Sequence, residues 1–296
     1  MTSLATVLTA LAALSGVASA AACPRSFLEN ITSTYVTAQK SGQPALLTAL
    51  TTASPNFIYL ENNKLSDLRT GAVSTPLKID VARSLHDPDE CATFTELIAA
   101  TDPRPHVIHT RIVLDAASQQ ATLMESVVTQ PGDWLFNATG TLELNNGENW
   151  DPIPPAQQAA SRAAVQALGD AYFDRFDNTS VVVPWSEPCY RLEGGMAARG
   201  EMKDGECEMV WPSTIVIPYR RYVVDVEMGA VDLFIGFPGL DRTQGQAPMP
   251  DSHLFRVEGG KIKYVHTASA CVVAGCGLNA SSFGRRSGTR PTLLKV

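Results

Sequence analysis

A proline-rich seam near the middle of the chain, residues 149–155 (NWDPIPP), limits which folds are open to it. Three prolines fall in four residues there, which stops both helix and strand. Elements of the same kinds follow in the same order on both sides. Each half has an amphipathic helix pattern (26–40; 161–177), a short extended piece (56–63; 189–195) and long β-like runs (106–115, 121–129 and a short 132–144; 220–237 and 253–267).

This matching order predicts a duplicated plan. Leu60-Glu61-Asn62-Asn63 takes the place in the first half that Leu192-Glu193-Gly194-Gly195 takes in the second. Helices followed by antiparallel strands indicate the α+β class, with a curved sheet over helices in each of two tandem units. The expected boundaries are a leader at 1–20, a first unit at 21–150, a second unit at 151–278 and a flexible tail at 279–296.

The N-terminus has the pattern of a secretory signal peptide. An apolar run from Leu4 to Val17 is too short to span a membrane, and small residues follow it at Ala18-Ser19-Ala20. The expected location is therefore outside the cell or in the lumen of the secretory pathway. Four sequons mark the expected glycosylation sites Asn30, Asn137, Asn178 and Asn279.

All six cysteines follow the leader, as expected for disulfides formed in an oxidising compartment. Six cysteines allow many connectivities. We favour local pairing: Cys23 with Cys91, Cys189 with Cys207, and Cys271 with Cys276.

Charge and motifs exclude several classes of protein. The net charge of −7 and the lack of a basic patch argue against nucleic acid as a partner. No segment after the leader is apolar enough to span a membrane. The chain lacks metal-ligand spacing, a G-x-S-x-G elbow and a phosphate-binding loop, so we expect no metal and no cofactor. The expected partner is a hydrophobic small molecule, and a homodimer is left open.

The hairpin sequence HLFRVEGGKIKYVHT, residues 253–267, holds the main candidate residues. A two-residue turn at Gly259-Gly260 would set His253 opposite His266 and Phe255 opposite Tyr264 on one apolar face. Two facing imidazoles cannot both be charged easily, which would leave an acid and a base near neutral pH. The alternative is that one histidine merely hydrogen-bonds a neighbour.

The neighbouring hairpin suggests a second pair. A turn at Met228-Gly229 would set Asp225 opposite Asp232, either as a solvated pair clamped by an arginine or as carboxylates that share a proton. Tyr222 would lie on the apolar face of this hairpin. In the first half, Tyr59 and Glu61 alternate on one strand face, and His109 and Arg111 alternate on another. A charged cluster is formed by Lys78, Asp80, Arg83 and His86. These residues either line a second cavity or, as we favour for most of them, form structural ion pairs.

The second half resembles the nuclear transport factor 2-like superfamily, which includes scytalone dehydratase, ketosteroid isomerase and SnoaL-like polyketide cyclases. The resemblance rests on the helix ending Tyr172-Phe173-Asp174-Arg175-Phe176, the hairpin around Met228-Gly229, and the stretch from His253 to Ile262. It implies a cone-shaped fold in which a curved sheet and helices enclose a cavity.

Nearly the whole chain after the leader also resembles a family of secreted fungal glycoproteins, mostly of unknown function. Some of its members are hetero-Diels–Alderases of tropolonic sesquiterpene biosynthesis. The stretches that carry this resemblance are TPLKIDVARSLHD (75–87), FTELI (94–98), GDWLFNATG (132–140), ENWDPIP (148–154), GDAYFDRF (169–176), RRYVVD (220–225), GFPGLDR (236–242) and PDSHLFRVEGGKI (250–262).

These resemblances imply a cofactor-independent enzyme of secondary metabolism. It would dehydrate an alcohol to a quinone methide and catalyse its hetero-Diels–Alder cycloaddition with a terpene alkene. His253 and His266 are the candidates for proton transfer, and Tyr264, Tyr222, Phe255 and Arg256 are those for substrate binding. The alternatives are a non-catalytic secreted protein that binds an apolar small molecule, and a secreted effector or adhesin that has no small ligand.

Overall fold

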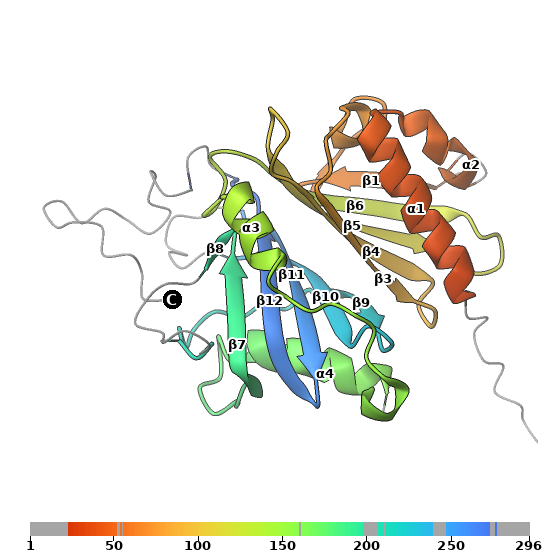
Figure 1. Ribbon diagram of the computed structural model, residues 1–296. Coiled ribbons are helices and arrows are strands. Elements are labelled where there is room, and N and C mark those ends of the chain that lie inside the picture. The colour runs from red at the N-terminus through yellow and green to blue at the C-terminus, as the bar shows by residue number, and fades with distance from the viewer. Residues whose placement is uncertain are drawn as a thin grey trace, which may run out of the picture.

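The structure is a computed structural model that describes residues 23–51, 54, 56–159, 161–197, 207–209, 211–238, 247–272 and 276. It is an α+β protein in which two six-stranded sheets each carry a long helix on one face (Figure 1). The predicted fold class is confirmed at this level. The predicted leader at 1–20, the glycosylation site Asn279 and the tail at 279–296 lie outside the described residues.

The first unit forms a sheet with the strand order β2-β1-β6-β5-β4-β3. In this sheet β1 runs parallel to β6, and the other neighbouring strands are antiparallel. Its elements are α1 (Arg25–Ser41), η1 (Pro44–Leu47), α2 (Thr48–Thr51), β1 (Ile58–Glu61), β2 (Lys64–Leu65), η2 (Ala72–Ser74), β3 (Val81–Asp87), β4 (Ala92–Ala99), β5 (His106–Leu114) and β6 (Ala121–Thr129).

The second unit repeats this topology, with the strand order β8-β7-β12-β11-β10-β9 and the parallel pair β7 and β12. The predicted correspondence of the two halves also holds in register, since Leu60 pairs with Glu125 and Leu192 pairs with His266. The remaining elements are α3 (Ala138–Asn145), η3 (Pro155–Gln157), α4 (Arg162–Asp174), β7 (Trp185–Glu193), β8 (Met196–Ala197), β9 (Arg221–Asp225), β10 (Ala230–Phe237), β11 (Met249–Glu258) and β12 (Lys261–Ser269).

Each long helix packs through one apolar face onto its own sheet, as its period predicts. Leu28, Ile31 and Tyr35 of α1 are buried against the first sheet, and Val165 and Tyr172 of α4 against the second. The opposite faces of the two sheets pack on each other through one apolar cluster, which includes Leu85, Phe94, Val127, Val223, Phe234 and Leu254. Each sheet therefore has one face toward a helix and one face toward the other sheet.

The segment 132–144, predicted to be β-like, instead contains the helix α3. Asn137 caps this helix, because its side chain accepts a hydrogen bond from the Gly140 amide. The Asn137 amide donates to the Gly194 carbonyl at 2.7 Å. A Cβ on Gly195 would lie 2.0 Å from the Asn137 carbonyl oxygen, so only glycine allows this approach between the β7–β8 turn and α3.

The predicted facing of His253 and His266 is wrong. Val257 pairs with Ile262 as expected, but a register shift between Arg256 and Val257 moves the rest of β11 by one residue. His253 therefore pairs with Thr267, and His266 pairs with Leu254. Because successive side chains alternate across a strand, the one-residue shift places the two histidines on opposite faces of the sheet.

The predicted facing of Asp225 and Asp232 is also wrong. Asp225 pairs with Ala230, and Asp232 pairs with Val223. The loop between the strands has four residues, and the Asp225 carboxylate accepts a hydrogen bond from the Met228 amide within it at 3.1 Å. The apolar face of this hairpin is as predicted, with Val224, Val231, Leu233 and Ile235 buried under α4.

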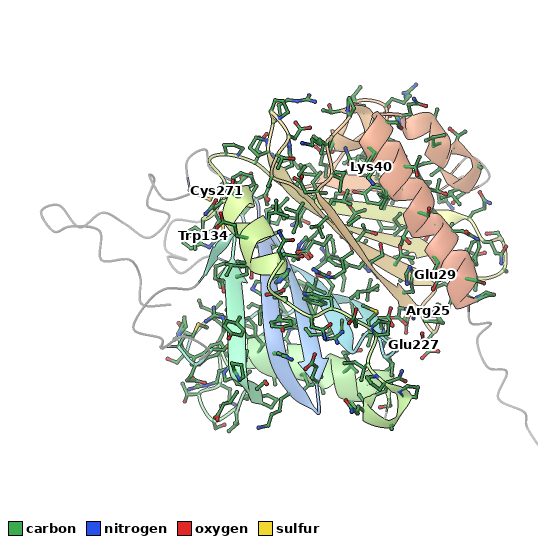
Figure 2. All side chains as sticks on the ribbon, in the orientation of Figure 1. Arg25, Glu29, Lys40, Trp134, Glu227 and Cys271 are labelled. Carbon is green, nitrogen blue, oxygen red and sulfur yellow. A yellow bond between two sulfur atoms is a disulfide. The ribbon has the colours of Figure 1, made fainter. Side chains whose placement is uncertain are left out.

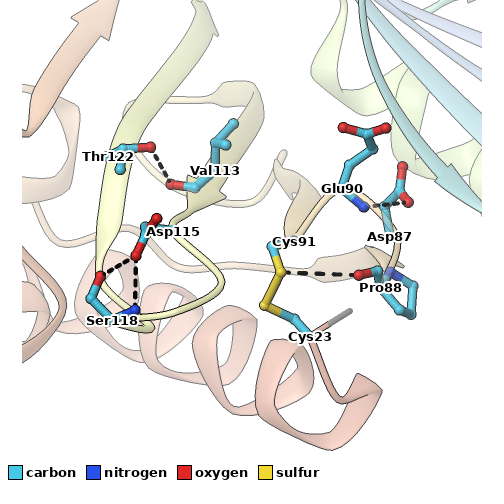
Figure 3. The surroundings of a disulfide bond; sticks show 9 residues. All are labelled: Cys23, Asp87, Pro88, Glu90, Cys91, Val113, Asp115, Ser118 and Thr122. Atoms are coloured by element: carbon cyan, nitrogen blue, oxygen red, sulfur yellow. Dashed lines mark hydrogen bonds between the residues drawn. A yellow bond between two sulfur atoms is a disulfide. The ribbon is translucent and has the colours of Figure 1, made fainter. Parts of the chain in front are cut away.

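The three disulfides are the pairs that we favoured: Cys23–Cys91, Cys189–Cys207 and Cys271–Cys276. Cys23–Cys91 ties the residues before α1 to the β3–β4 turn (Figure 3). Among the described helices, none combines the length and the apolar character needed to cross a membrane. Three of the predicted glycosylation sites are exposed: Asn30, Asn137 and Asn178.

Two arginine–aspartate pairs form equivalent contacts between the two units. Arg25, the first residue of α1, donates two hydrogen bonds of 2.9 Å to Asp225 at the end of β9. Arg162, the first residue of α4, donates to Asp87 at the end of β3 at 2.8 to 3.1 Å. Each aspartate also accepts a backbone amide of the other unit at 2.9 Å, from His86 for Asp225 and from Val224 for Asp87.

These two contacts fasten the start of each helix to the edge strand of the other unit. Figure 2 shows Arg25 and Glu29 at the start of α1, close to Glu227 of the β9–β10 turn. The arginine side chains keep partial exposure, whereas the carboxylates of Asp87 and Asp225 are buried. Without its arginine, either aspartate would be a buried anion held only by hydrogen bonds.

We predict that Arg25→Ala lowers the free energy of unfolding by about 2 kcal/mol, because it leaves the buried Asp225 carboxylate without a counter-charge. Chemical denaturation monitored by circular dichroism would measure the loss. Arg69→Ala is the control, since Arg69 and Asp67 form an exposed pair and should not change stability measurably. Equal effects of the two substitutions would contradict a structural role for these contacts.

Candidate functional site

Polar side chains from three neighbouring strands meet on the face of the second sheet that α4 covers. His253 of β11 pairs with Thr267 of β12, which pairs in turn with Glu193 of β7. Arg191 lies two residues before Glu193 on the same face, and the Tyr172 hydroxyl of α4 hydrogen-bonds it. These five residues are called the second-unit polar cluster below.

The cluster holds an internal ion pair. Arg191 donates through Nη2 to Glu193 at 2.5 Å and to the Tyr172 hydroxyl at 3.3 Å, and its Nη1 lies 3.0 Å from Met209 Sδ. Burial opposes the charge on Arg191, but Tyr172 and Glu193 outweigh it and raise the pKa of the guanidinium. Burial also raises the pKa of Tyr172, so this phenol stays protonated at neutral pH.

Three polar atoms of the cluster have no hydrogen-bond partner among the described residues: His253 Nδ1, Thr267 Oγ1 and Arg191 Nε. Asp251 Oδ1 lies 3.4 Å from His253 Nδ1, but the two are not aligned as a hydrogen bond, and Asp251 accepts from Ser269 instead. A buried polar group without a partner costs about 1–3 kcal/mol. Three such atoms on neighbouring residues indicate a site that receives a polar group.

Aromatic rings surround the polar atoms. The His253 ring lies 4.9 Å from Phe173, 5.4 Å from Tyr172 and 6.0 Å from Phe255, measured between ring centroids. Tyr172 in turn contacts Trp185 and Trp211 at 6.0 and 5.4 Å. Aromatic and apolar walls with a few fixed polar groups are typical of small-molecule sites.

The first unit provides an internal comparison, because the same register positions hold a closed set of hydrogen bonds. Thr110 pairs with Ser126, which pairs with Glu61, so these residues correspond to His253, Thr267 and Glu193. The Tyr35 hydroxyl lies 2.7 Å from Thr110, and Thr110 lies 2.8 Å from Ser126. Tyr59, at the position of Arg191, donates to Glu61 at 2.7 Å. Unpaired atoms at these positions therefore belong to the second unit.

The other histidine of the predicted pair lies between the two sheets. His266 Nδ1 is 2.8 Å from Glu96 and its Nε2 is 2.7 Å from Glu148, so one imidazole joins the first sheet to the linker after α3. Burial opposes its charge, but the two carboxylates outweigh it and raise the pKa of His266 to about 9. His266 is therefore an imidazolium that binds the two units together.

The inter-sheet network continues from Glu96 to His109, Ser252 and Asp232. His109 lies 3.4 Å from Glu96 and 2.9 Å from Ser252, whose hydroxyl donates to Asp232 at 2.7 Å. Burial lowers the pKa of His109 and raises that of Asp232 well above its usual range. Ser252, His109 and Glu96 have the composition of a hydrolase triad, but Ser252 is fully buried and its hydroxyl donates to Asp232. This arrangement stabilises the interface rather than presenting a nucleophile.

The predicted site residues divide between the two faces of the second sheet. His253 and Phe255 lie on the α4 face with Tyr222, whose hydroxyl donates to Asp170 and has a pKa raised to about 12 by burial. Arg256 and Tyr264, which pair with each other across β11 and β12, lie on the inter-sheet face with His266. Arg256 donates to the carbonyls of Met228 and Asp151, and Tyr264 packs against Trp150.

The first-half polar residues form structural contacts. Arg83 binds Glu96, Arg111 binds Glu125, and Tyr59 binds Glu61. Sequence reasoning missed Arg191 and Thr267, and it used Glu193 only as a marker of the repeat. The alternation Arg191-x-Glu193 in an extended piece was the available signal. Within the described part of the chain, no group of three or more His, Cys, Asp or Glu side chains could hold a metal ion.

Comparison with known proteins assigns a family model to part of the chain. Residues 158–269 are similar to a family described as Domain of unknown function (DUF8021). The matched region runs from just before α4 to the end of β12, so it covers the helix and the whole sheet that form the polar cluster. No curated protein matches the chain.

We predict that the free energy of unfolding falls as the pH rises into the alkaline range, because His266 loses its proton there. Its folded-state pKa of about 9 lies above the ordinary value of 6.5, so its contribution is complete below pH 6.5 and is lost as the pH rises through 9. The loss should be on the order of 3 kcal/mol. The groups that face His266 are Glu96, Glu148 and, through Glu96, His109 and Arg83.

Urea unfolding at pH values from 6.5 to 10 would measure this dependence. His266→Gln should remove most of it, whereas His106→Gln, a change at a partly exposed histidine at the start of β5, should preserve it. A slope that His266→Gln leaves intact would show that the imidazolium does not bridge the carboxylates.

Proposed function

We propose that the chain is a secreted enzyme that removes water from an apolar, ring-bearing alcohol, and that the second-unit polar cluster is its active site. The observation that carries this proposal is the group of three unpaired polar atoms at His253, Thr267 and Arg191, beneath aromatic side chains. The equivalent positions of the first unit hold no such group, since their side chains bond to one another.

His253 is the proposed general acid. It protonates the departing hydroxyl, the carbon–oxygen bond breaks, and the oxygen leaves as water. When the substrate also carries a phenol conjugated with that carbon, the phenol gives its proton to the neutral His253, which restores the acid, and a neutral quinone methide forms. The Asp251 carboxylate lies 3.4 Å from Nδ1 of this imidazole. His266 has no part in this step, because it lies on the other face of the sheet.

The second proposed step follows the family resemblance. The quinone methide combines with an alkene in a hetero-Diels–Alder cycloaddition that forms two bonds and transfers no proton. Aromatic walls hold the two reactants together, which removes the entropy of their encounter and can contribute several kcal/mol. Thr267 and Arg191 would donate hydrogen bonds to the oxygen of the heterodiene. Both steps are redox-neutral, so they require no oxidant or reductant.

Export is part of the same proposal. Three disulfides fit an oxidising compartment, and exposed Asn30, Asn137 and Asn178 could carry glycans. A secreted non-catalytic protein that binds an apolar molecule is the competing function. The two differ in one respect: only the enzyme converts what it binds.

We predict that His253→Gln lowers the rate of product formation by about 100-fold, because the general acid is lost. The assay supplies ortho-hydroxybenzyl alcohol and ethyl vinyl ether and measures the chroman adduct by liquid chromatography and mass spectrometry. His106→Gln is the matched control and should keep full activity.

Wild-type protein that binds ortho-hydroxybenzyl alcohol without forming adduct would support the non-catalytic function. Adduct formation that survives His253→Gln would remove His253 from the mechanism.

A further inference from the structure

The chemistry of Arg191 limits what the second-unit polar cluster can bind. Its Nη1 and Nη2 already contact Met209, Tyr172 and Glu193, whereas its Nε has no partner among the described residues. A guanidinium N–H can only donate a hydrogen bond, so the partner of Arg191 Nε must be an acceptor. The side chain is buried, so the acceptor must come to it inside the protein.

Two other unpaired atoms lie on neighbouring strands. Thr267 pairs with His253 on one side and with Glu193, two residues from Arg191, on the other. Residues paired in this way have Cα atoms about 4.5–5.5 Å apart, so their side chains can reach one small functional group. The Thr267 hydroxyl and either nitrogen of a histidine can donate, which makes all three atoms compatible with one acceptor oxygen.

The charges of the second-unit polar cluster favour a neutral oxygen over a carboxylate as the acceptor. Glu193 neutralises Arg191 through a direct hydrogen bond, and the buried carboxylate of Asp251 lies beside His253. An incoming carboxylate would lie beside Glu193, which already neutralises Arg191, and its desolvation would not be compensated there. A neutral oxygen can accept from Arg191 Nε without this cost.

We propose that the second-unit polar cluster binds a neutral, ring-bearing carbonyl compound by its oxygen at Arg191 Nε, and that Glu193 makes the site reject the corresponding carboxylates. This inference rests on the proposed function, whose quinone methide is itself a neutral, ring-bearing carbonyl compound, and it names the ligand class of that site. The ring lies against Tyr172 and Phe255, and the oxygen points to Arg191 and Thr267. Glu193, with 12% of its side chain exposed, and the half-buried Trp185 and Trp211 mark the side from which the ligand enters.

The first unit supports the assignment by contrast. Glu61 occupies the position of Glu193, but Tyr59 replaces Arg191 and donates its hydroxyl to Glu61. That pair contains no cation and leaves no unpaired donor. Glu61 is therefore a matched control: a carboxylate at the same register position that should have no influence on ligand charge.

Acetophenone and benzoate are the probes, since they share a ring and differ in the charge of the oxygen group. We expect wild-type protein to bind acetophenone more tightly than benzoate by about tenfold or more in titration calorimetry at pH 7. Glu193→Gln removes the counter-charge of Arg191 and should narrow that preference by about tenfold, mainly through tighter binding of benzoate. Glu61→Gln should leave both affinities unchanged.

Thermal unfolding would show whether Glu193→Gln folds, and a second variant, Thr267→Val, tests the inference if it does not. Thr267→Val removes one donor with little change in shape and should weaken acetophenone binding several-fold. Equal binding of the two probes by wild-type protein, or a preference that neither variant alters, would overturn the inference and leave the proposed enzyme standing. If wild-type protein bound neither probe, the inference would fail, and adduct formation from ortho-hydroxybenzyl alcohol would decide the proposed function separately.

Discussion

The packing of the two units depends on two arginine contacts that cross between them, those of Arg25 and Arg162. Each arginine opens one helix and binds the aspartate that ends the edge strand of the other unit. These contacts hold the two sheets face to face, so that each sheet has one face for its helix and one for its partner. The polar side chains on the inter-sheet faces, such as His266 and Glu96, then serve the interface. Residues on the helix faces are left to differ between the units.

The side chains that face the helices therefore differ between two units that share one strand order. In the first, Tyr35, Thr110 and Ser126 hydrogen-bond in series beneath α1, and Tyr59 donates to Glu61. In the second, His253, Thr267 and Arg191 occupy the equivalent positions and leave three polar atoms without partners. A buried polar network is stable only when every member is satisfied. The second unit therefore has our candidate site at positions where the first unit has hydrogen-bonded side chains, although the two units share one strand order.

Helical period, strand runs and the seam predicted the α+β class, both long helices and the matched order, because these features are local. Register was not predictable in this way. The shift at Arg256 and Val257 accompanies contacts with the β9–β10 turn: Arg256 donates to the Met228 carbonyl, and the Val257 amide donates to Gly229. One residue of shift moves a side chain to the other face of a sheet. Arg191 and Thr267 were missed for the same reason, since they become a site only when β7, β12 and β11 are in register.

Arg191 Nε is the proposed hydrogen-bond donor to the oxygen of a bound ligand. Nuclear magnetic resonance of the ¹⁵N-labelled protein would test it most directly, because the Arg191 Nε–H signal reports its own hydrogen bond. On titration with acetophenone we predict a downfield shift of that proton, as expected when an unpaired donor gains an acceptor, while the Nε–H signal of the exposed Arg69 stays unchanged. A bound ligand that leaves the Arg191 signal in place would contradict the account.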